Sequence, residues 1–160
     1  MPRSSSTFSV RTAQPADAEA ACVVLRRSIE ELCFADHDGD PVTLDLWLAN
    51  KTPANVLSWI DAPAQRVLIA VEAGAILGVG AASASGEILL NYVSPDARFR
   101  GVSKALLGEL EAFLRGQANA VVRLSSTRTA HRFYRAAGYE DCGPPETWGR
   151  MRPQPMRKRL

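Results

Sequence analysis

The segment ARFRGVSKALL (97–107) carries two arginines, Arg98 and Arg100, directly before Gly101 and an apolar-periodic run. The first turn of a helix offers amide N–H groups without intrahelical acceptors, together with the positive end of the helix dipole. A glycine lets an anion approach that backbone, and arginine side chains add charge-assisted hydrogen bonds. The segment therefore predicts a pyrophosphate site, with an ordinary arginine-decorated loop as the alternative.

Two predicted elements flank this segment and would position it. The apolar run EILLNYV (87–93) predicts a strand that ends at Ser94–Pro95, and the periodic residues after Gly101 predict a helix. One face of that helix carries Val102, Leu106, Leu110 and Phe113. A strand that passes through a tight loop into a helix is a setting in which a helix N-terminus can bind phosphate.

The remaining patterns predict a mixed-sheet α/β or α+β domain. Strands are expected at 8–12, at two segments within 66–85 that meet at 73–75, and at 120–126, with weak strand signals towards the C-terminus. Helices are expected at 14–33, 43–50, 53–60 and 129–137, and the acidic stretch 34–43 is expected to be a loop. We expect a single domain over residues 8–160 after a flexible tail at 1–7.

Composition excludes several classes of function. A net charge of +2 is too small for a general nucleic-acid footprint, and the short basic end MRKRL does not indicate one. The N-terminal segment lacks the apolar core of a signal peptide, and no apolar run is long enough to span a membrane, which predicts a cytoplasmic protein. The three cysteines have unrelated spacings, so we expect neither a disulfide framework nor a metal site.

Two motifs resemble those of the GNAT family of acetyl-CoA-dependent N-acetyltransferases. YVSPDARFRGVSKALLGELE resembles the family's acyl-CoA signature, matched here by Arg98-x-x-Gly101-x-Ser103, where Ser103 replaces the usual Gly or Ala. TAHRFYRAAGYED resembles the second motif, a helix with Phe-Tyr followed by Gly and an aromatic residue. The resemblance implies a mostly antiparallel sheet of six to seven strands, a splayed fourth and fifth strand, and about four flanking helices.

The resemblance also implies acetyl-CoA as co-substrate, with no metal. In the family, a bulge in the fourth strand exposes backbone groups that hold the pantetheine, which here would be those of Tyr92 and Val93. The pyrophosphate would lie on the amides that open the following helix. The implied residues of that diphosphate site are Arg98, Arg100, Gly101, Val102, Ser103 and Lys104.

Two residues acquire catalytic roles from the resemblance. Tyr134 matches the tyrosine beside the thioester sulfur, and a phenol of ordinary pKa is protonated at neutral pH and could protonate the leaving thiolate. Glu87, on the predicted fourth strand, is the first candidate for the general base, and an exposed strand-edge residue is the alternative. Either Thr127 or Thr129 is expected to cap the helix that carries Tyr134.

The acceptor half of the site is the least defined. Asp36, His37 and Asp38, with Asp40, would face the acceptor, where the acids attract a cationic amine and His37 accepts its proton. A solvated acidic loop is the alternative. The predicted activity is acetyl transfer to a primary amine in a ternary complex, in a possible homodimer. A GNAT-like domain that binds acyl-CoA without chemistry is the competing function.

Overall fold

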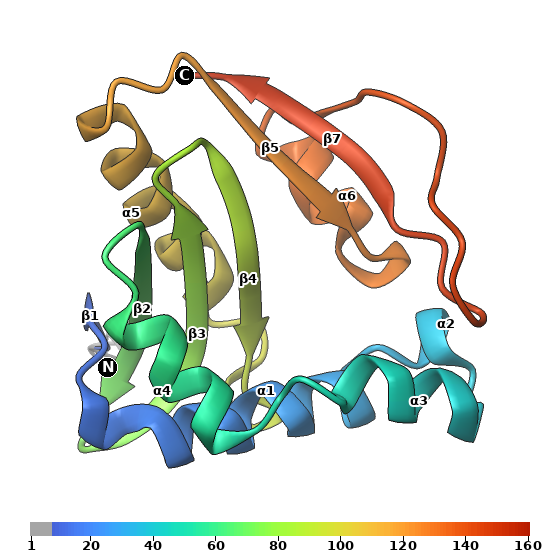
Figure 1. Cartoon of the computed structure of the whole chain (residues 1–160), viewed down its shortest axis with the longest axis horizontal. Helices are drawn as coiled ribbons and strands as arrows, with labels where there is room; N and C mark the ends of the chain where they lie inside the picture. Colours follow the sequence, from blue (N-terminus) through green and yellow to red (C-terminus); the bar gives the residue numbers. More distant parts are fainter. Residues whose placement is uncertain (1–7) are drawn as a thin grey trace, which may run out of the picture.

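A computed structural model describes residues 8–160 of the chain, so the predicted tail at 1–7 lies outside the described residues. Seven strands form one sheet in the order β1-β2-β3-β4-β5-β7-β6 (Figure 1). Neighbouring strands are antiparallel except β4 and β5, which are parallel. The strands are β1 (Ser9–Thr12), β2 (Gln65–Glu72), β3 (Ala75–Ser83), β4 (Glu87–Val93), β5 (Val121–Ser126), β6 (Glu140–Asp141) and β7 (Gln154–Arg159). The predicted mixed-sheet fold is confirmed.

Helices cover both faces of the sheet. They are α1 (Ala18–Leu32), α2 (Phe34–His37), α3 (Pro41–Leu48), α4 (Pro53–Asp61), α5 (Val102–Gly116) and α6 (Arg128–Ala136), with 3-10 turns η1 (Pro15–Asp17) and η2 (Pro95–Ala97). The sequence led us to expect about four helices. It also led us to expect a loop throughout 34–43, but α2 occupies the start of that stretch and α3 begins within it, at Pro41.

Strand alternation divides the core into two layers. Val67 and Ile69 of β2 pack with α1 and α4, whereas Leu68 and Ala70, which alternate with them, pack with α5. Successive strand residues point to opposite faces, which is why one apolar strand can serve both layers. A third cluster joins the end of α1 to α3 and to Met151 in the β6–β7 connection.

A bulge at Leu89 changes the path of β4. Ile88 lies opposite Ala82 and Leu90 lies opposite Ala81, so Leu89 is the extra residue. Parallel pairing to β5 is limited to Glu87 opposite Arg123, and beyond it the two strands separate (Figure 1). The bulge and splay expected for the fourth strand are therefore present, and the backbone of β4 past Leu89 has an open side towards β5.

The bulge also changes which side chains share a face. Glu87 lies opposite Ser83 and Leu90 lies opposite Ala81, so both belong to the face covered by α1 and α4. Asn91 lies opposite Gly80, whose position contacts Leu110 and Leu106 of α5, so Asn91 belongs to the other face. No helix within residues 8–160 combines the length and apolar character needed to cross a bilayer.

Candidate active site

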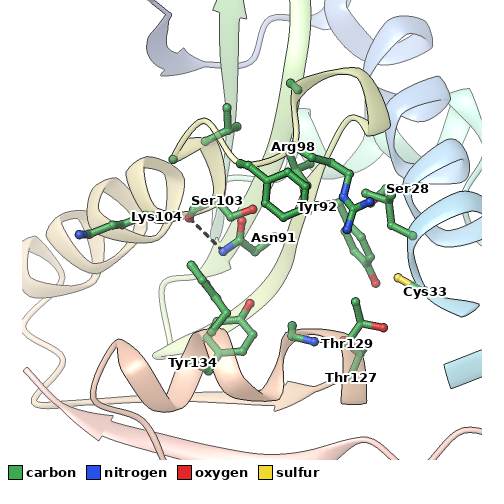
Figure 2. A pocket seen from close by; sticks show the side chains of 18 residues that line it. Ser28, Cys33, Asn91, Tyr92, Arg98, Ser103, Lys104, Thr127, Thr129 and Tyr134 are labelled. Atoms are coloured by element: carbon green, nitrogen blue, oxygen red, sulfur yellow. Dashed lines mark hydrogen bonds between the residues drawn. The ribbon is translucent and has the colours of Figure 1, made fainter. Parts of the chain in front are cut away.

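A cavity of about 640 Å³ lies where β4 separates from β5, between α5, α6 and the end of α1 (Figure 2). The cavity extends through the gap between β4 and β5 from one face of the sheet to the other. Ser28 and Cys33 line it on the α1 side, and residues of α5 line it on the opposite side. Most of the predicted cofactor residues and the predicted acid line it. They are Tyr92, Val93, Arg98, Gly101, Val102, Ser103, Lys104 and Tyr134.

The connection from β4 to α5 is fixed by an ion pair to α1 and by a hydrogen bond within the connection itself. Asp96 in η2 forms an ion pair with Arg27 of α1 at 2.9 Å, and the Ser94 hydroxyl accepts from the Asp96 N–H. Gly101, the residue before α5, has φ of +81°, which glycine adopts without the strain that a Cβ brings. The first-turn amides of α5 are thus presented at the edge of the cavity.

The two arginines of this connection have different environments. Arg98 is exposed, and its guanidinium lies 4.6 Å from the ring centroid of Phe99, itself 92% exposed. Arg100 does not line the cavity: its guanidinium forms a close ion pair with Glu72 of β2. Arg98 can therefore turn its charge to a ligand, whereas the charge of Arg100 is already paired.

Two residues, Thr127 and Asp36, fix the N-terminus of α6, the helix that carries Tyr134. The Thr127 hydroxyl accepts from the Ala130 N–H at 3.1 Å, so Thr127 is the cap. The carboxylate of Asp36, on α2, accepts three more hydrogen bonds: from the Arg128 N–H at 2.6 Å, and from the Thr129 N–H and hydroxyl at 3.2 and 2.6 Å. These bonds join α2 to α6 across the mouth of the splay and hold the helix in place.

The acidic stretch is consequently less open than the sequence suggested. Asp36 is 4% exposed and committed to α6. His37 is 2% exposed, with Nε2 3.0 Å from the Ile29 carbonyl and Nδ1 accepting from the Gly39 N–H. Asp40 caps α3 through Thr43. Asp38 is exposed, with Arg150 3.8 Å away, so of the three proposed acceptor-binding residues it alone has a free surface.

Comparison with known proteins identifies the family. Residues 43–160 match the family model described as an acetyltransferase (GNAT) domain. The chain belongs to the GNAT family. No curated protein sequence is a significant match to it.

Solved GNAT structures share the fold along nearly the whole chain. A GCN5-related N-acetyltransferase from Rhodopseudomonas palustris is 24% identical, with a TM-score of 0.86 over 97% of both chains. The PaiA N-acetyltransferase from Thermoplasma acidophilum, solved in complex with coenzyme A, is 20% identical, with a TM-score of 0.82 over 96% of this chain and 99% of its own. YncA from Salmonella typhimurium, described as a putative acetyltransferase and solved with acetyl-CoA, is 18% identical, with a TM-score of 0.74 over 97% and 95%.

In this GNAT domain the phenol of Tyr134 is buried against the cavity wall. Its ring packs edge-on against Phe133 and Tyr139. Burial raises the pKa of Tyr134 to about 12, with a smaller opposing effect from the Asn91 side chain. The group therefore carries its proton through neutral pH.

Glu87 lies apart from this cavity. It is exposed at the closed end of the splay and does not line the space around Tyr134. The β3 partners of Glu87 and Tyr92, Ser83 and Val79, are four positions apart, which corresponds to about 13 Å along the sheet. Glu87 faces the α1 side of the sheet, whereas the α5 amides lie on the other side.

Sequence reasoning missed Asn91 and Cys33. The Asn91 amide donates to the Ser103 carbonyl at 3.3 Å, and its Oδ1 is buried with no hydrogen-bond partner among the described residues. The sequence signal for Asn91 was its position as an isolated polar residue within the apolar strand EILLNYV. The Cys33 thiol lines the cavity, and burial raises its pKa to about 12, so it is a neutral thiol there.

The site can thus bind an anionic, amide-bearing ligand and supply one proton. The α5 amides and Arg98 suit the anion, and the open side of β4 offers backbone hydrogen bonds. The orphaned Asn91 oxygen suits an N–H donor. The protonated phenol of Tyr134 lies in the cavity wall and is a group that can give up a proton.

Proposed function

We propose that residues 8–160 form an acetyltransferase domain that transfers an acetyl group from acetyl-CoA to a primary amine by direct attack. The observation that carries this proposal is the convergence of the α5 amides, the open backbone of β4 and the Tyr134 phenol on one cavity. The bound coenzyme A and acetyl-CoA of the two structural relatives support the choice of co-substrate.

The proposed cofactor-binding roles belong mainly to residues that line the cavity. Backbone amides from Gly101 to Lys104 take the diphosphate, and Arg98 adds its charge. Arg100 contributes through its backbone, since Glu72 already pairs its guanidinium. Backbone groups of Tyr92 and Val93 hold the pantetheine and polarise the thioester carbonyl, as the donors of an oxyanion hole do.

The reaction forms one N–C bond and breaks one C–S bond. The amine attacks the thioester carbonyl and loses a proton, and Tyr134 supplies a proton to the departing thiolate. Glu87 is the proposed acceptor of the amine's proton. Because Glu87 lies outside the cavity and beyond the reach of one bridging water, the proton would have to reach it along a chain of water molecules. The sequence also leads us to expect a cytoplasmic enzyme, with a homodimer as the possible assembly.

Titration calorimetry with acetyl-CoA and CoA tests the binding part. Gly101→Glu places a carboxylate at the α5 N-terminus and should abolish binding. Gly74→Glu is the matched control: Gly74 has φ of +80° and open space around it, but it lies in the β2–β3 turn away from the cavity. Equal binding by wild type and Gly101→Glu would refute the proposed diphosphate site.

Replacement of the proposed acid distinguishes an enzyme from a domain that only binds acyl-CoA. Tyr134→Phe should reduce kcat by on the order of 10²-fold or more while CoA affinity is retained. Tyr139→Phe removes a hydroxyl that points to Glu111, outside the cavity, and should leave kcat unchanged. An acetylation rate in Tyr134→Phe equal to wild type rules out the acid role, and a wild type that binds CoA but acetylates no amine favours the binding domain.

A further inference from the structure

A second cavity, of about 260 Å³, lies on the α1 and α4 side of the sheet. Its lining residues include Asn50, Lys51, Trp59, Gln65, Leu89 and Leu90. Leu89 and Leu90 also line a narrow cavity inside the splay, which in turn shares Tyr92 and Tyr134 with the large cavity. The shared lining residues thus place these three spaces side by side, between Lys51 and the proposed reaction centre.

Lys51 is a buried cation without a carboxylate partner. The residue is 7% exposed, and its Nζ donates to the neutral Asn50 side chain at 2.7 Å. None of the ion pairs formed within residues 8–160 includes Lys51. Burial lowers the pKa of Lys51 to about 8. A buried ammonium without a counter-charge is costly, and an incoming anion would relieve that cost.

The backbone around Lys51 is held rigidly. Its carbonyl accepts from the Arg26 guanidinium at 2.9 Å and from the Cys22 thiol at 3.2 Å. The neighbouring Asn50 carbonyl accepts from the Asn55 amide at 2.9 Å. Arg26 has no carboxylate partner among the described residues either, so it adds a second positive charge. This support fixes the position of the ammonium before any ligand arrives.

We propose that Lys51 binds a carboxylate of the acceptor, so that the substrate is a primary amine that carries a carboxylate some distance from its amine. This inference rests on the proposed acetyltransferase function. Trp59 and Leu90 supply apolar walls for an aliphatic chain, and Asn50 and Gln65 supply further polar contacts.

The strand geometry gives the expected separation between the carboxylate and the amine of the acceptor. From Leu89 and Leu90 to Tyr92 the path along β4 is two or three residues, or about 7–10 Å. Glu87 shares the Lys51 face: it lies two strands from Gln65, through Ser83, or about 10 Å away. A cation at that distance from the proposed reaction centre at Tyr92 complements an ω-amino acid better than an α-amino acid, whose charges are adjacent.

The test compares 6-aminohexanoate with 6-aminohexanamide, which keeps the chain and amine but loses the negative charge. Each is titrated calorimetrically into protein saturated with CoA. The acid should bind at least about tenfold more tightly to wild type, as expected for one charge-assisted hydrogen bond. Lys51→Met should abolish this preference and Lys51→Arg should retain much of it. Arg115→Gln removes an exposed charge at the far end of α5 and should leave the preference intact.

The outcomes separate this inference from the activity on which it rests. Equal binding of acid and amide to wild type, absence of binding by the acid, or a preference retained in Lys51→Met overturns the Lys51 site. CoA affinity of Lys51→Met equal to wild type confirms that the variant is folded. If the acid binds through Lys51 but is not acetylated, the carboxylate site stands and the proposed transfer to this amine fails.

Discussion

The Asp36 carboxylate offers the sharpest test of how the site is built. Asp36→Ala removes the acceptor for the Arg128 N–H, the Thr129 N–H and the Thr129 hydroxyl, at the start of α6. The Thr127 cap remains, so the helix still begins at the same residue. What is lost is the tether between α2 and α6, together with part of the capping of the helix that carries Tyr134.

The free-energy cost can be estimated bond by bond. A hydrogen bond to a charged acceptor contributes about 1.5–3 kcal/mol when the donor is buried. Arg128 and Thr129 are exposed residues, so water can satisfy the donors and about 1 kcal/mol per bond is the better figure. Three bonds give about 3 kcal/mol, which lowers Tm by about 6–12 °C for a domain of this size.

Thermal and urea unfolding of Asp36→Ala, followed by circular dichroism, measures this cost. Asp38→Asn is the matched control, because Asp38 is exposed, its nearest cation lies 3.8 Å away, and asparagine tolerates its φ of +54°. The control should change the unfolding free energy by less than about 0.5 kcal/mol. A wild-type Tm in Asp36→Ala together with a raised KM for the amine would refute this reasoning, because it would mean that Asp36 serves the acceptor and not α6.

Three further predictions concern packing and protonation. In Gly78→Ala the new Cβ would lie 2.7 Å from Val102, so we expect a loss of about 1–3 kcal/mol in urea unfolding, whereas Gly108→Ala on open helix surface should gain stability. The raised pKa of Tyr134 keeps its phenol protonated, so the tyrosinate absorbance of wild type minus Tyr134→Phe should stay flat up to about pH 11. Lys158→Met leaves Glu111, 5% exposed, without its cation and should cost about 3–5 kcal/mol of unfolding free energy, much of it recovered when Glu111→Gln is added.

Local patterns predicted the elements that flank the proposed diphosphate site. The strand at 87–93 ends at Val93, and the helix after Gly101 begins at Val102. Both signals are local, because hydrophobic periodicity and a left-handed glycine act within a few residues. The capping role of Thr127 was predictable for the same reason.

Contacts between distant segments explain what the sequence could not show. Asp36 reads as a surface acid because its partners, Arg128 and Thr129, are more than ninety positions away in the chain. His37 is buried through contacts with the end of α1, which replace the expected loop with a helical turn. In the sequence Lys51 is indistinguishable from a surface lysine, and only the folded structure shows that it is buried. Hydrophobic periodicity carries no record of such long-range pairings.

The bulge at Leu89 determines which side chains of β4 lie on each face of the sheet. In a regular strand Glu87 and Asn91 would share a face, because side chains repeat every second residue. The extra residue reverses that relation: Glu87 stays on the α1 side with Leu90, and Asn91 turns to the α5 side, where it donates to Ser103. The same bulge precedes the loss of pairing with β5, which opens the passage between the two faces. One inserted residue therefore turns Glu87 and Asn91 to opposite faces of the sheet, beside a splay whose lining includes Tyr92 and Tyr134.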